Sequence, residues 1–478
     1  MLFNSINFAF FLPIVYLLYW FVANKNHKKQ NILLLVASYF FYSCWDYLFL
    51  FLLIFSTLLD YFSGLKIYKS QNSKTKKFWL WLSISANLGL LGFFKYYNFF
   101  ATSFSELLAS FGLNSNPLLL KVILPVGISF YTFHGLSYVI DIYYDRIKPE
   151  KNFVIYSVFV SFFPLLVAGP IERATHLLPQ IQRNRKFNYT ATADGLRQIL
   201  WGLFKKIVIA DNCAEYVNLI FNDSAHQSGS NLVLGALLFA FQIYCDFSGY
   251  SDIALGTARL FGINLLRNFA FPYFSRDIAE FWRRWHISLT SWFKDYLYIP
   301  LGGSKTGSWI KVRNIFIIFL ISGFWHGANW TFLAWGFLNA LYFLPLLLLN
   351  KNRNNTEIVA KDRLIPNFSE IIQILITFLL TTFAWIFFRA NNITHAINYI
   401  HGIFNKSLFT KPTIFPLTLL VLLLFFIIIE WIGRENQYAL ERLGFKWPKM
   451  VRISFYYLLI IMIFIFMGKE QEFIYFQF

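Results

Sequence analysis

The sequence predicts an all-α polytopic membrane protein. Of its 478 residues, 57% are hydrophobic and only 14% are charged, whereas a soluble domain is about 45–50% apolar and about 25% charged. Phenylalanine occurs 59 times and tryptophan 15 times, which suits contact with lipid chains and anchoring at the membrane interface. Apolar runs separated by short basic loops recur along the chain, and no stretch is long and polar enough to form a soluble domain.

The apolar runs predict roughly eleven membrane helices, because a spanning helix needs about 20 mainly apolar residues. The candidate segments are 6–23, 31–44, 46–64, 78–96, 117–140, 153–168, 198–210, 231–247, two within 312–349, 368–389, 412–432 and 450–467. Three of them, 31–44, 153–168 and 198–210, are short, so we expect them to be tilted, re-entrant or buried in protein. The sequence shows no internal repeat and no low-complexity linker, and we expect a single domain over residues 1–478.

The distribution of positive charge predicts the topology. The loops 24–30, 65–77 and 145–151 each contain several lysine or arginine residues, whereas 98–116 contains none. Basic loops stay on the cytoplasmic side, so the N-terminus is expected outside. Residues 1–22 carry no lysine or arginine and the lysines follow them, which is the reverse of a cleavable signal peptide.

The net charge of +18 indicates membrane lipids rather than nucleic acid as a partner. The basic residues lie in short loops between apolar runs, where they meet anionic headgroups. Cys44, Cys213 and Cys245 are far apart, with no CxxC pair and no histidine at zinc-like spacing. The cysteine pattern therefore predicts neither a disulfide framework nor a structural metal site.

Residues 275–297 differ from the membrane segments. Their apolar side chains recur at helical spacing, namely Ile278, Phe281, Trp282, Trp285, Leu289, Trp292, Phe293 and Tyr296. Polar residues alternate with this stripe on the other side, which predicts an amphipathic helix in or near the interface plane.

His326 is the sharpest candidate for chemistry. It lies in ISGFWHGANW, inside an otherwise apolar run, with Gly323 and Gly327 on either side. Glycines allow the backbone to leave a helix and a substrate to approach, and an imidazole accepts or donates a proton near neutral pH. A structural hydrogen bond to a neighbouring helix explains such a histidine equally well on these grounds alone.

His286 is the second candidate. It lies on the apolar stripe of the predicted amphipathic helix and so faces protein or lipid rather than water. Taken alone it reads more readily as a structural hydrogen-bonding residue than as a catalyst. As cofactor-binding residues the sequence offers only weak candidates, Lys205, Lys206 and Asn329; the lysines serve equally well to snorkel to the interface.

The segment QIYCDFSGYSD at 242–252 is a polar cluster that follows an apolar run. Gly249 is expected to break the helix there, and the cluster is interpreted as a capped helix end rather than as the lining of a cavity. The sequence contains no glycine-rich phosphate loop, no GxSxG elbow and no metal constellation. It therefore offers no serine nucleophile of its own.

Two segments, FWRRWHISLTSWFKDYLYIPLGGS (281–304) and SGFWHGANW, contain His286 and His326. Together they resemble the paired-histidine signature of the membrane-bound O-acyltransferase (MBOAT) superfamily, and more narrowly the membrane subunit of bacterial alginate O-acetyltransferase. Further similar segments are LPVGISFYTFHGLSYVIDIYYDR (124–146), LVAGPIER (166–173), LFKKIVIADN (203–212), QIYCDFSGYSDIALG (242–256) and AWIFFRA (384–390). The resemblance extends from near residue 1 to about 470.

The resemblance implies that His326 is the catalytic histidine and that His286 supports it in a central tunnel. It implies acetyl-CoA as a cytoplasmic donor, no metal, and transfer of the acetyl group across the inner membrane of a bacterium for O-acetylation of an extracytoplasmic polysaccharide. It also implies a partner with a serine-esterase-like fold that acylates the polymer. Alginate, peptidoglycan and other exopolysaccharides are all open as acceptors.

Other functions remain to be distinguished from this one. A transporter or flippase of a lipid-linked sugar fits the many membrane segments, although no pair of matching broken helices is apparent. A scaffold that anchors extracellular enzymes would tolerate the loss of His326. Within the same superfamily, a D-alanyl transferase for teichoic acid or an acyltransferase for a small lipid also fits the sequence.

Overall fold

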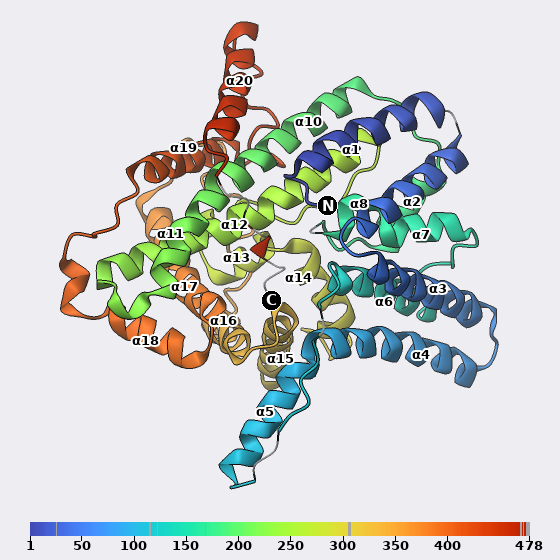
Figure 1. Ribbon diagram of the computed structural model, residues 1–478, viewed down its shortest axis with the longest axis horizontal. Helices are drawn as coiled ribbons and strands as arrows, with labels where there is room; N and C mark the ends of the chain where they lie inside the picture. Colours follow the sequence, from blue (N-terminus) through green and yellow to red (C-terminus); the bar gives the residue numbers. More distant parts are fainter. Residues whose placement is uncertain are drawn as a thin grey trace. The chain divides into compact units, whose positions relative to one another are not determined.

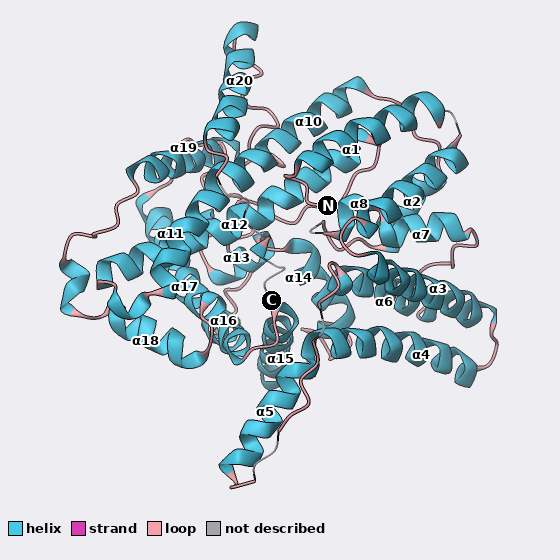
Figure 2. Cartoon of the chain, in the orientation of Figure 1, coloured by secondary structure: helices cyan, strands magenta, loops and turns pink. Residues whose placement is uncertain are grey.

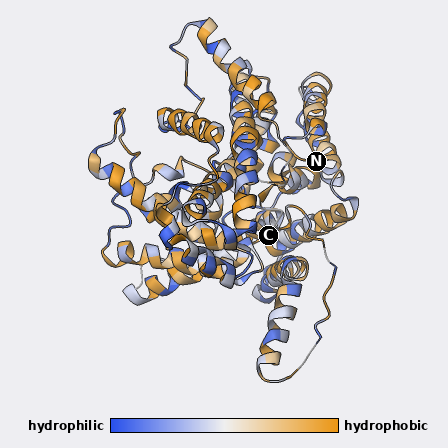
Figure 3. Ribbon diagram, turned by 60° about the vertical axis from the view of Figure 1, so that its left-hand side comes forward, coloured by the Kyte–Doolittle hydropathy of each residue, from blue (hydrophilic) through white to orange (hydrophobic). Residues whose placement is uncertain are grey.

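The computed structural model describes residues 1–24, 26–113, 116–121, 123–167, 169–304, 307–468, 471 and 473–474. In this part of the chain all regular elements are helices and none is a strand (Figure 2). Hydrophobic residues dominate most of these helices (Figure 3). The predicted all-α membrane fold is therefore confirmed.

The chain forms two compact units. Unit 1 comprises Met1–Gly195 and Thr257–Leu266, and unit 2 comprises Leu196–Gly256 and Arg267–Phe478. The chain passes from one unit to the other within two helices, α10 (Tyr189–Leu203) and α12 (Gly229–Leu260), and again between Leu266 and Arg267. The single domain expected over residues 1–478 stays a prediction.

Unit 1 is built from nine helices within the described residues (Figure 1). They are α1 (Ile6–Leu17), α2 (His27–Ser43), α3 (Tyr47–Lys69), α4 (Ser73–Leu91), α5 (Tyr97–Ser110), α6 (Ile128–Tyr143), α7 (Phe153–Ser161), α8 (Phe163–Leu166) and α9 (Ala174–Gln182). Short π-helical turns follow α1 at Leu18–Val22 and α4 at Gly92–Tyr96.

Asp60 shows how unit 1 accommodates a carboxyl group within an apolar helix. Its Oδ1 accepts hydrogen bonds from Ser83 Oγ at 2.6 Å and from Asn87 Nδ2 at 2.9 Å, so α4 supplies two donors to a buried acid of α3. A Cβ atom on Gly135 would lie 1.8 Å from Asp60 Oδ2. The glycine therefore lets α6 approach α3 at the level of this acid.

The short segment predicted at 153–168 is two helices, α7 and α8, joined at Phe162. Its described residues from 155 to 167 are buried. Ser38 Oγ of α2 accepts a hydrogen bond from the Phe163 N–H at 3.0 Å, which satisfies a backbone donor at the break. Burial in protein, one of the alternatives expected for this segment, is what the structure shows.

Unit 2 contains the remaining helices, with α10 and α12 running into it. They are α11 (Asp211–Asn222), α13 (Ile278–Arg284), α14 (Ile287–Phe293), α15 (Ser308–His326), α16 (Trp330–Leu348), α17 (Phe368–Arg389), α18 (Ile393–Ile403), α19 (Leu417–Gly433) and α20 (Lys449–Ile465). Seven-residue and five-residue π-helical segments, η3 (Phe204–Ala210) and η6 (Lys294–Tyr298), follow α10 and α14.

Six helical segments among the described residues are long and apolar enough to cross a membrane. They are Tyr47–Lys69, Ser73–Ser110, Gly229–Leu260, Ser308–His326, Trp330–Leu348 and Phe368–Arg389. Three shorter apolar segments, Ile6–Val22, Phe153–Leu166 and Leu417–Gly433, accompany them. The count of roughly eleven spans stays a prediction.

The polar cluster at 242–252 lies inside α12 and not at a helix end, so the expectation of a break at Gly249 is wrong. Gly249 instead allows close packing, because a Cβ there would lie 2.8 Å from the carbonyl oxygen of Gly202 in α10. Because Gly202 and Gly249 both lack a side chain, the backbones of α10 and α12 come into contact at this point.

The structure also differs from the single amphipathic helix expected at 275–297. This segment consists of α13, α14 and η6, with a break between Arg284 and Ile287. Polar residues that were expected on the outer face are buried, with Glu280 and Ser288 each 1% exposed. Arg283 and Lys294 of this segment remain exposed, so burial extends to part of the expected polar face and not to all of it.

Candidate active site

The break between α13 and α14 is formed by His286. Its backbone has φ 43° and ψ 55°, in the left-handed region that side-chain-bearing residues rarely adopt. The neighbouring segment satisfies the backbone groups that the break exposes. The Ala270 N–H donates to the Arg284 carbonyl and the Ile287 N–H donates to the Asn268 carbonyl, both at 2.9 Å. Tertiary hydrogen bonds on either side thus hold His286 in a strained conformation.

The side chain of His286 is buried among aromatic rings. Its ring meets that of Phe247 edge-on, with 4.7 Å between centroids, and that of Trp325 at 6.0 Å. Neither ring nitrogen makes a hydrogen bond to any described residue. Burial lowers the pKa of His286 to about 3, so the imidazole is neutral at physiological pH and has one N–H donor and one nitrogen acceptor unused.

His326 is the last residue of α15 and is 4% exposed. Its ring meets Trp335 edge-on at 5.2 Å between centroids and Phe388 at 5.4 Å. The chain then turns into extended conformation at Gly327, where a Cβ would lie 2.0 Å from the Phe332 ring. Gly327 is needed here because no larger residue fits beside Phe332. The end of α15 places the His326 ring against α16 and α17.

Glycines also fix the spacing of the two helices next to His326. A Cβ on Gly323 would lie 2.2 Å from the Phe332 carbonyl oxygen, and one on Gly336 would lie 2.3 Å from the Phe319 carbonyl oxygen. The backbones of α15 and α16 therefore touch at two levels. Such small-residue contacts are the usual way in which membrane helices approach closely.

His286 and His326 line one cavity of about 50 Å³. The other lining residues come from α13, α14 and α15 and are mostly apolar: Trp282, Leu289, Thr290, Phe293, Ile318, Phe319 and Ser322. The structure thus brings together the two histidines that the sequence analysis singled out, from elements separated in the chain.

Four tryptophans form a wall behind this cavity. Trp335 stacks on Trp385 at 5.5 Å between centroids, Trp285 lies 5.1 Å from Trp385, and Trp282 lies 5.6 Å from Trp335. All four are at most 8% exposed. Large aromatic surfaces exclude water, and in a dry site a hydrogen bond to a developing charge is worth more than in water.

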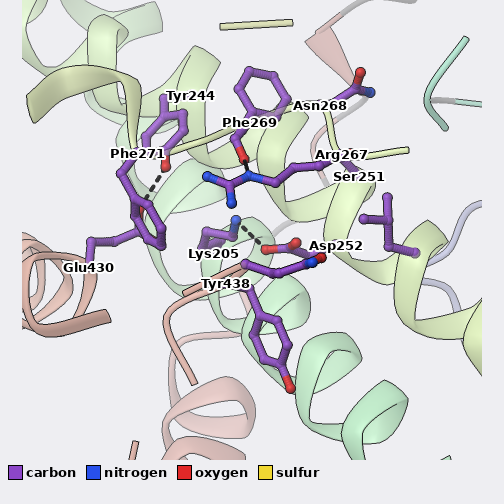
Figure 4. A pocket seen from close by; sticks show the side chains of 12 residues that line it. Lys205, Tyr244, Ser251, Asp252, Arg267, Asn268, Phe269, Phe271, Glu430 and Tyr438 are labelled. Carbon is purple, nitrogen blue, oxygen red and sulfur yellow. Dashed lines mark hydrogen bonds and ion pairs between the residues drawn. The ribbon is translucent and has the colours of Figure 1, made fainter. Parts of the chain in front are cut away.

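Lys205, a weak candidate for cofactor binding, lies elsewhere. It is 3% exposed, and its Nζ pairs with Asp252 Oδ2 at 2.6 Å (Figure 4). It lines a separate polar cavity of about 20 Å³, together with Arg267, Tyr244 and Glu430. The Tyr244 hydroxyl donates to Glu430 Oε2 at 2.7 Å in the same view. Lys205 therefore does not face the histidine cavity.

Lys206 and Asn329 are likewise engaged by the protein. Lys206 is 1% exposed, and its Nζ lies 2.7 Å from both Asp211 Oδ1 and Asp246 Oδ1. Asn329 caps α16 by accepting a hydrogen bond from the Thr331 N–H at 3.0 Å. Their interpretation as cofactor-binding residues stays a prediction, and the contacts observed for them are structural.

Phe473 and Ile474, to which no sequence motif assigns a role, lie next to residues that surround the site. The ring of Phe473 is buried, 4.5 Å from Tyr250 and 6.0 Å from Phe247, the residue that also meets His286. The Ile474 N–H donates to Asp246 Oδ2 at 2.7 Å.

The arrangement suits acyl transfer. It offers two imidazoles in one aromatic-lined cavity, and burial lowers the pKa of one of them, His286, whose ring nitrogens make no hydrogen bond to the described residues. Neutral imidazole is the form that removes a proton from a hydroxyl group as the group attacks a carbonyl. The cavity contains no serine or cysteine in the sharp-turn setting of a hydrolase nucleophile.

Comparison with known proteins assigns the family. Residues 144–390 match the model of the MBOAT, membrane-bound O-acyltransferase family, a range that contains both histidines. The chain is 38% identical over 431 residues to the peptidoglycan O-acetyltransferase of Helicobacter pylori, covering 84% of this chain and 79% of that protein.

Two further relatives are similar to this chain at higher and lower coverage. The probable alginate O-acetylase AlgI of Pseudomonas aeruginosa is 36% identical over 456 residues, covering 94% of this chain and 84% of that protein. The teichoic acid D-alanyltransferase of Bacillus subtilis is 28% identical over 283 residues, covering 56% of this chain and 70% of that protein. The chain therefore belongs to the membrane-bound O-acyltransferase family and is an acyltransferase of the membrane.

Proposed function

We propose that this protein moves an acetyl group from cytoplasmic acetyl-CoA across the membrane for the O-acetylation of an extracytoplasmic polysaccharide. The single observation that carries the proposal is the cavity shared by His286 and His326 inside a member of an acyltransferase family. Relatives that cover most of the chain are named for O-acetylation of alginate and of peptidoglycan. These names support acetyl as the group and a polysaccharide as the final acceptor.

In the proposed reaction His326 is the general base. A hydroxyl group of the acceptor attacks the thioester carbonyl, and its proton passes to the imidazole of His326. The new C–O bond forms as the C–S bond breaks, and the imidazolium returns the proton to the leaving sulfur, so that CoA departs as the thiol. General-base assistance of this kind contributes roughly 10²–10⁴-fold to a rate.

His286 is proposed to orient the substrate in the same cavity. Its two ring nitrogens are buried and make no hydrogen bond to the described residues, and such groups are costly unless something binds to them. The neutral imidazole can donate its N–H to the thioester oxygen, where negative charge develops. His286 lines the cavity from the left-handed break between α13 and α14.

The direction of transfer follows from the proposed topology. The basic loops lie in the cytoplasm under the positive-inside rule, and the N-terminus lies outside. The donor then enters from the basic side and the acetyl group leaves on the far side, in the inner membrane of a bacterium. A serine-esterase-like partner there is proposed to receive the group and pass it to the polymer, since the cavity itself offers no hydrolase-like nucleophile.

The experiment measures label from [acetyl-¹⁴C]acetyl-CoA in inverted membrane vesicles that contain either the wild-type protein or His326→Ala. The proposal expects label on polymer or on a partner protein inside the vesicles, and its loss in the variant. Full transfer by His326→Ala would refute the role of this residue.

The same assay separates the remaining functions. Label from D-alanyl carrier protein, with none from acetyl-CoA, would favour the D-alanyl transfer for which the Bacillus subtilis relative is named. Movement of a lipid-linked sugar without acetyl transfer would favour a flippase. Polymer acetylation that survives loss of the chain's histidines would favour a scaffold.

A further inference from the structure

Unit 2 contains a second cavity, of about 200 Å³, that shares no lining residue with the histidine cavity. Two apolar helices form much of its wall. α17 contributes Ile374, Leu375 and Phe378, and α19 contributes Phe426, Ile427 and Glu430. Aromatic residues of α12 and of the segment 271–274 complete the lining. We call this space the lateral cavity.

The lateral cavity runs from the membrane-facing surface of unit 2 into its interior. Leu375 is 53% exposed, whereas Phe426 is 2% exposed. The outer faces of α17 and α19 beside it carry further exposed apolar side chains, among them Leu379 and Ile428. Because α17 is one of the helices long and apolar enough to cross a membrane, the mouth of the cavity faces the hydrocarbon of the bilayer.

The polar groups of the lining are already engaged by the protein. Glu430 Oε1 accepts a hydrogen bond from Trp201 Nε1 at 3.0 Å, and Oε2 accepts one from the Tyr244 hydroxyl at 2.7 Å. The Tyr273 hydroxyl donates to the Ala240 carbonyl at 2.6 Å. A buried water needs two to four polar partners, whereas apolar cavities of about 150 Å³ stay dry and bind small hydrocarbons. The lining therefore suits a hydrocarbon chain.

The position of the lateral cavity along α17 also suits a phospholipid. Leu375 lies seven residues after the first residue of α17, which is about 10 Å along a helix. The loop that precedes α17 carries two half-exposed cations, Lys361 and Arg363. Trp431 of α19 donates to the Leu364 carbonyl at 2.7 Å, so this loop lies at the end of α19 as well. Basic residues at such a level meet anionic headgroups, and the chain of the same lipid reaches the mouth.

We infer that the lateral cavity binds one acyl chain of a membrane phospholipid, which enters between α17 and α19. The lipid is neither donor nor acceptor of the acyl group, so the inference goes beyond the proposed function. The bound chain packs against Tyr244 and Tyr273, whose rings each lie 6.0 Å from that of Trp285. Because Trp285 belongs to the tryptophan wall and directly precedes His286, the chain supports that wall from behind.

The test uses the full chain in nanodiscs of phosphatidylethanolamine and phosphatidylglycerol. A small fraction of the lipid carries a photoreactive diazirine at the end of one acyl chain, and mass spectrometry identifies the labelled residues after irradiation. In the wild type, label is expected on Phe271 and Phe426, which line the cavity and are buried. Label at these two positions requires a chain end inside the protein.

Two substitutions place an indole at the mouth from different helices, Leu375→Trp and Ile427→Trp. Each has a matched control, Leu379→Trp and Ile428→Trp, at an exposed position of the same helix outside the lining. Label on Phe271 and Phe426 is expected to fall about tenfold in the mouth variants, which corresponds to lost contact with about two methylene groups. In the controls it should stay within about twofold of the wild type.

Three results would overturn the inference. The first is wild-type label confined to exposed residues such as Leu379. The second is label on Phe271 and Phe426 that neither mouth variant reduces. The third is an equal loss in the mouth variants and their controls, which indicates a general change in packing. None of these readouts depends on acetyl transfer, so failure of the proposed function leaves the test intact.

Discussion

His286 and His326 line the same small cavity, and the ring of Trp325 lies beside both. His286 lies at the break between α13 and α14, whereas His326 is the last residue of α15. The centroid of Trp325 lies 6.0 Å from that of His286 and 4.9 Å from that of His326. Because both imidazoles pack against one indole, variants of each histidine are compared for stability as well as for activity.

Replacement of His326 by alanine is expected to lower kcat for acetyl transfer by about 10²–10⁴-fold, the range for loss of a general base. The measurement is initial-rate transfer from labelled acetyl-CoA, with folding checked by the elution profile in detergent. His401→Ala is the control, because His401 is exposed in α18 and does not line the cavity. A similar loss in both variants would mean that the effect is not specific to the site.

His286 is expected to make the stability of the protein depend on pH. Because its pKa is lowered from 6.5 to about 3 in the folded protein, the unfolded chain binds the proton first as the pH falls. The stabilisation is fully present above about pH 6.5 and is lost toward pH 3, at up to about 1.4 kcal/mol per pH unit. Titration of unfolding in mixed micelles from pH 7 to pH 4 measures this loss.

His286→Gln removes the titrating group, so the difference in free energy of unfolding between wild type and variant should shrink or reverse as the pH falls. A difference that stays constant from pH 7 to pH 4 would show that the ring is not held neutral by burial. Transfer activity of the variant at pH 7 is expected to decrease less than in His326→Ala, because His286 is proposed only to orient the substrate.

Gly336→Ala is expected to destabilise the protein by about 1–3 kcal/mol, the usual cost of overpacking. Its Cβ would lie 2.3 Å from a backbone oxygen of α15, which must move away and carry His326 with it. Activity should therefore fall together with stability. Gly89→Ala in α4 is the control, since a Cβ there meets nothing within 4 Å; its stability should be unchanged or slightly higher.

Lys206→Met is expected to cost about 3–5 kcal/mol, because it leaves two buried carboxylates, Asp211 and Asp246, without their shared cation. Unfolding in mixed micelles measures the cost. Lys69→Met, at the exposed end of α3, should change stability by less than about 1 kcal/mol. A stable Lys206→Met protein with a raised Kd for CoA would instead favour the cofactor-binding role.

The sequence was sufficient to predict the helical class and a multi-pass membrane protein, and it singled out the two histidines that line one cavity; their catalytic role stays a prediction. These depend on composition, on apolar run length and on short motifs, all of which are local. The break at His286 could not be predicted, since Trp282 and Leu289 continue the helical spacing across it. The break is stabilised by backbone hydrogen bonds to Asn268 and Ala270. Such tertiary contacts do not alter the spacing of apolar residues in the sequence.

The partners of the buried charged residues could not be predicted from the sequence either. Lys205 and Lys206 are neighbours in the sequence, and their flanks suggested snorkelling or an anionic ligand. Their partners, Asp252 and Asp246, lie on a different helix and turn both lysines into interior ion pairs.

The left-handed backbone at His286 sets stability and activity in opposition at one position. Glycine adopts such a conformation freely, so His286→Gly would relieve strain of roughly 1–3 kcal/mol and remove two buried nitrogens that have no partner among the described residues. In a library selected only for thermal tolerance, this position should drift to glycine. In a library selected for acetyl transfer, the histidine should persist despite its cost in stability. The residue found at position 286 would therefore show whether selection has preserved catalysis or only the folded structure.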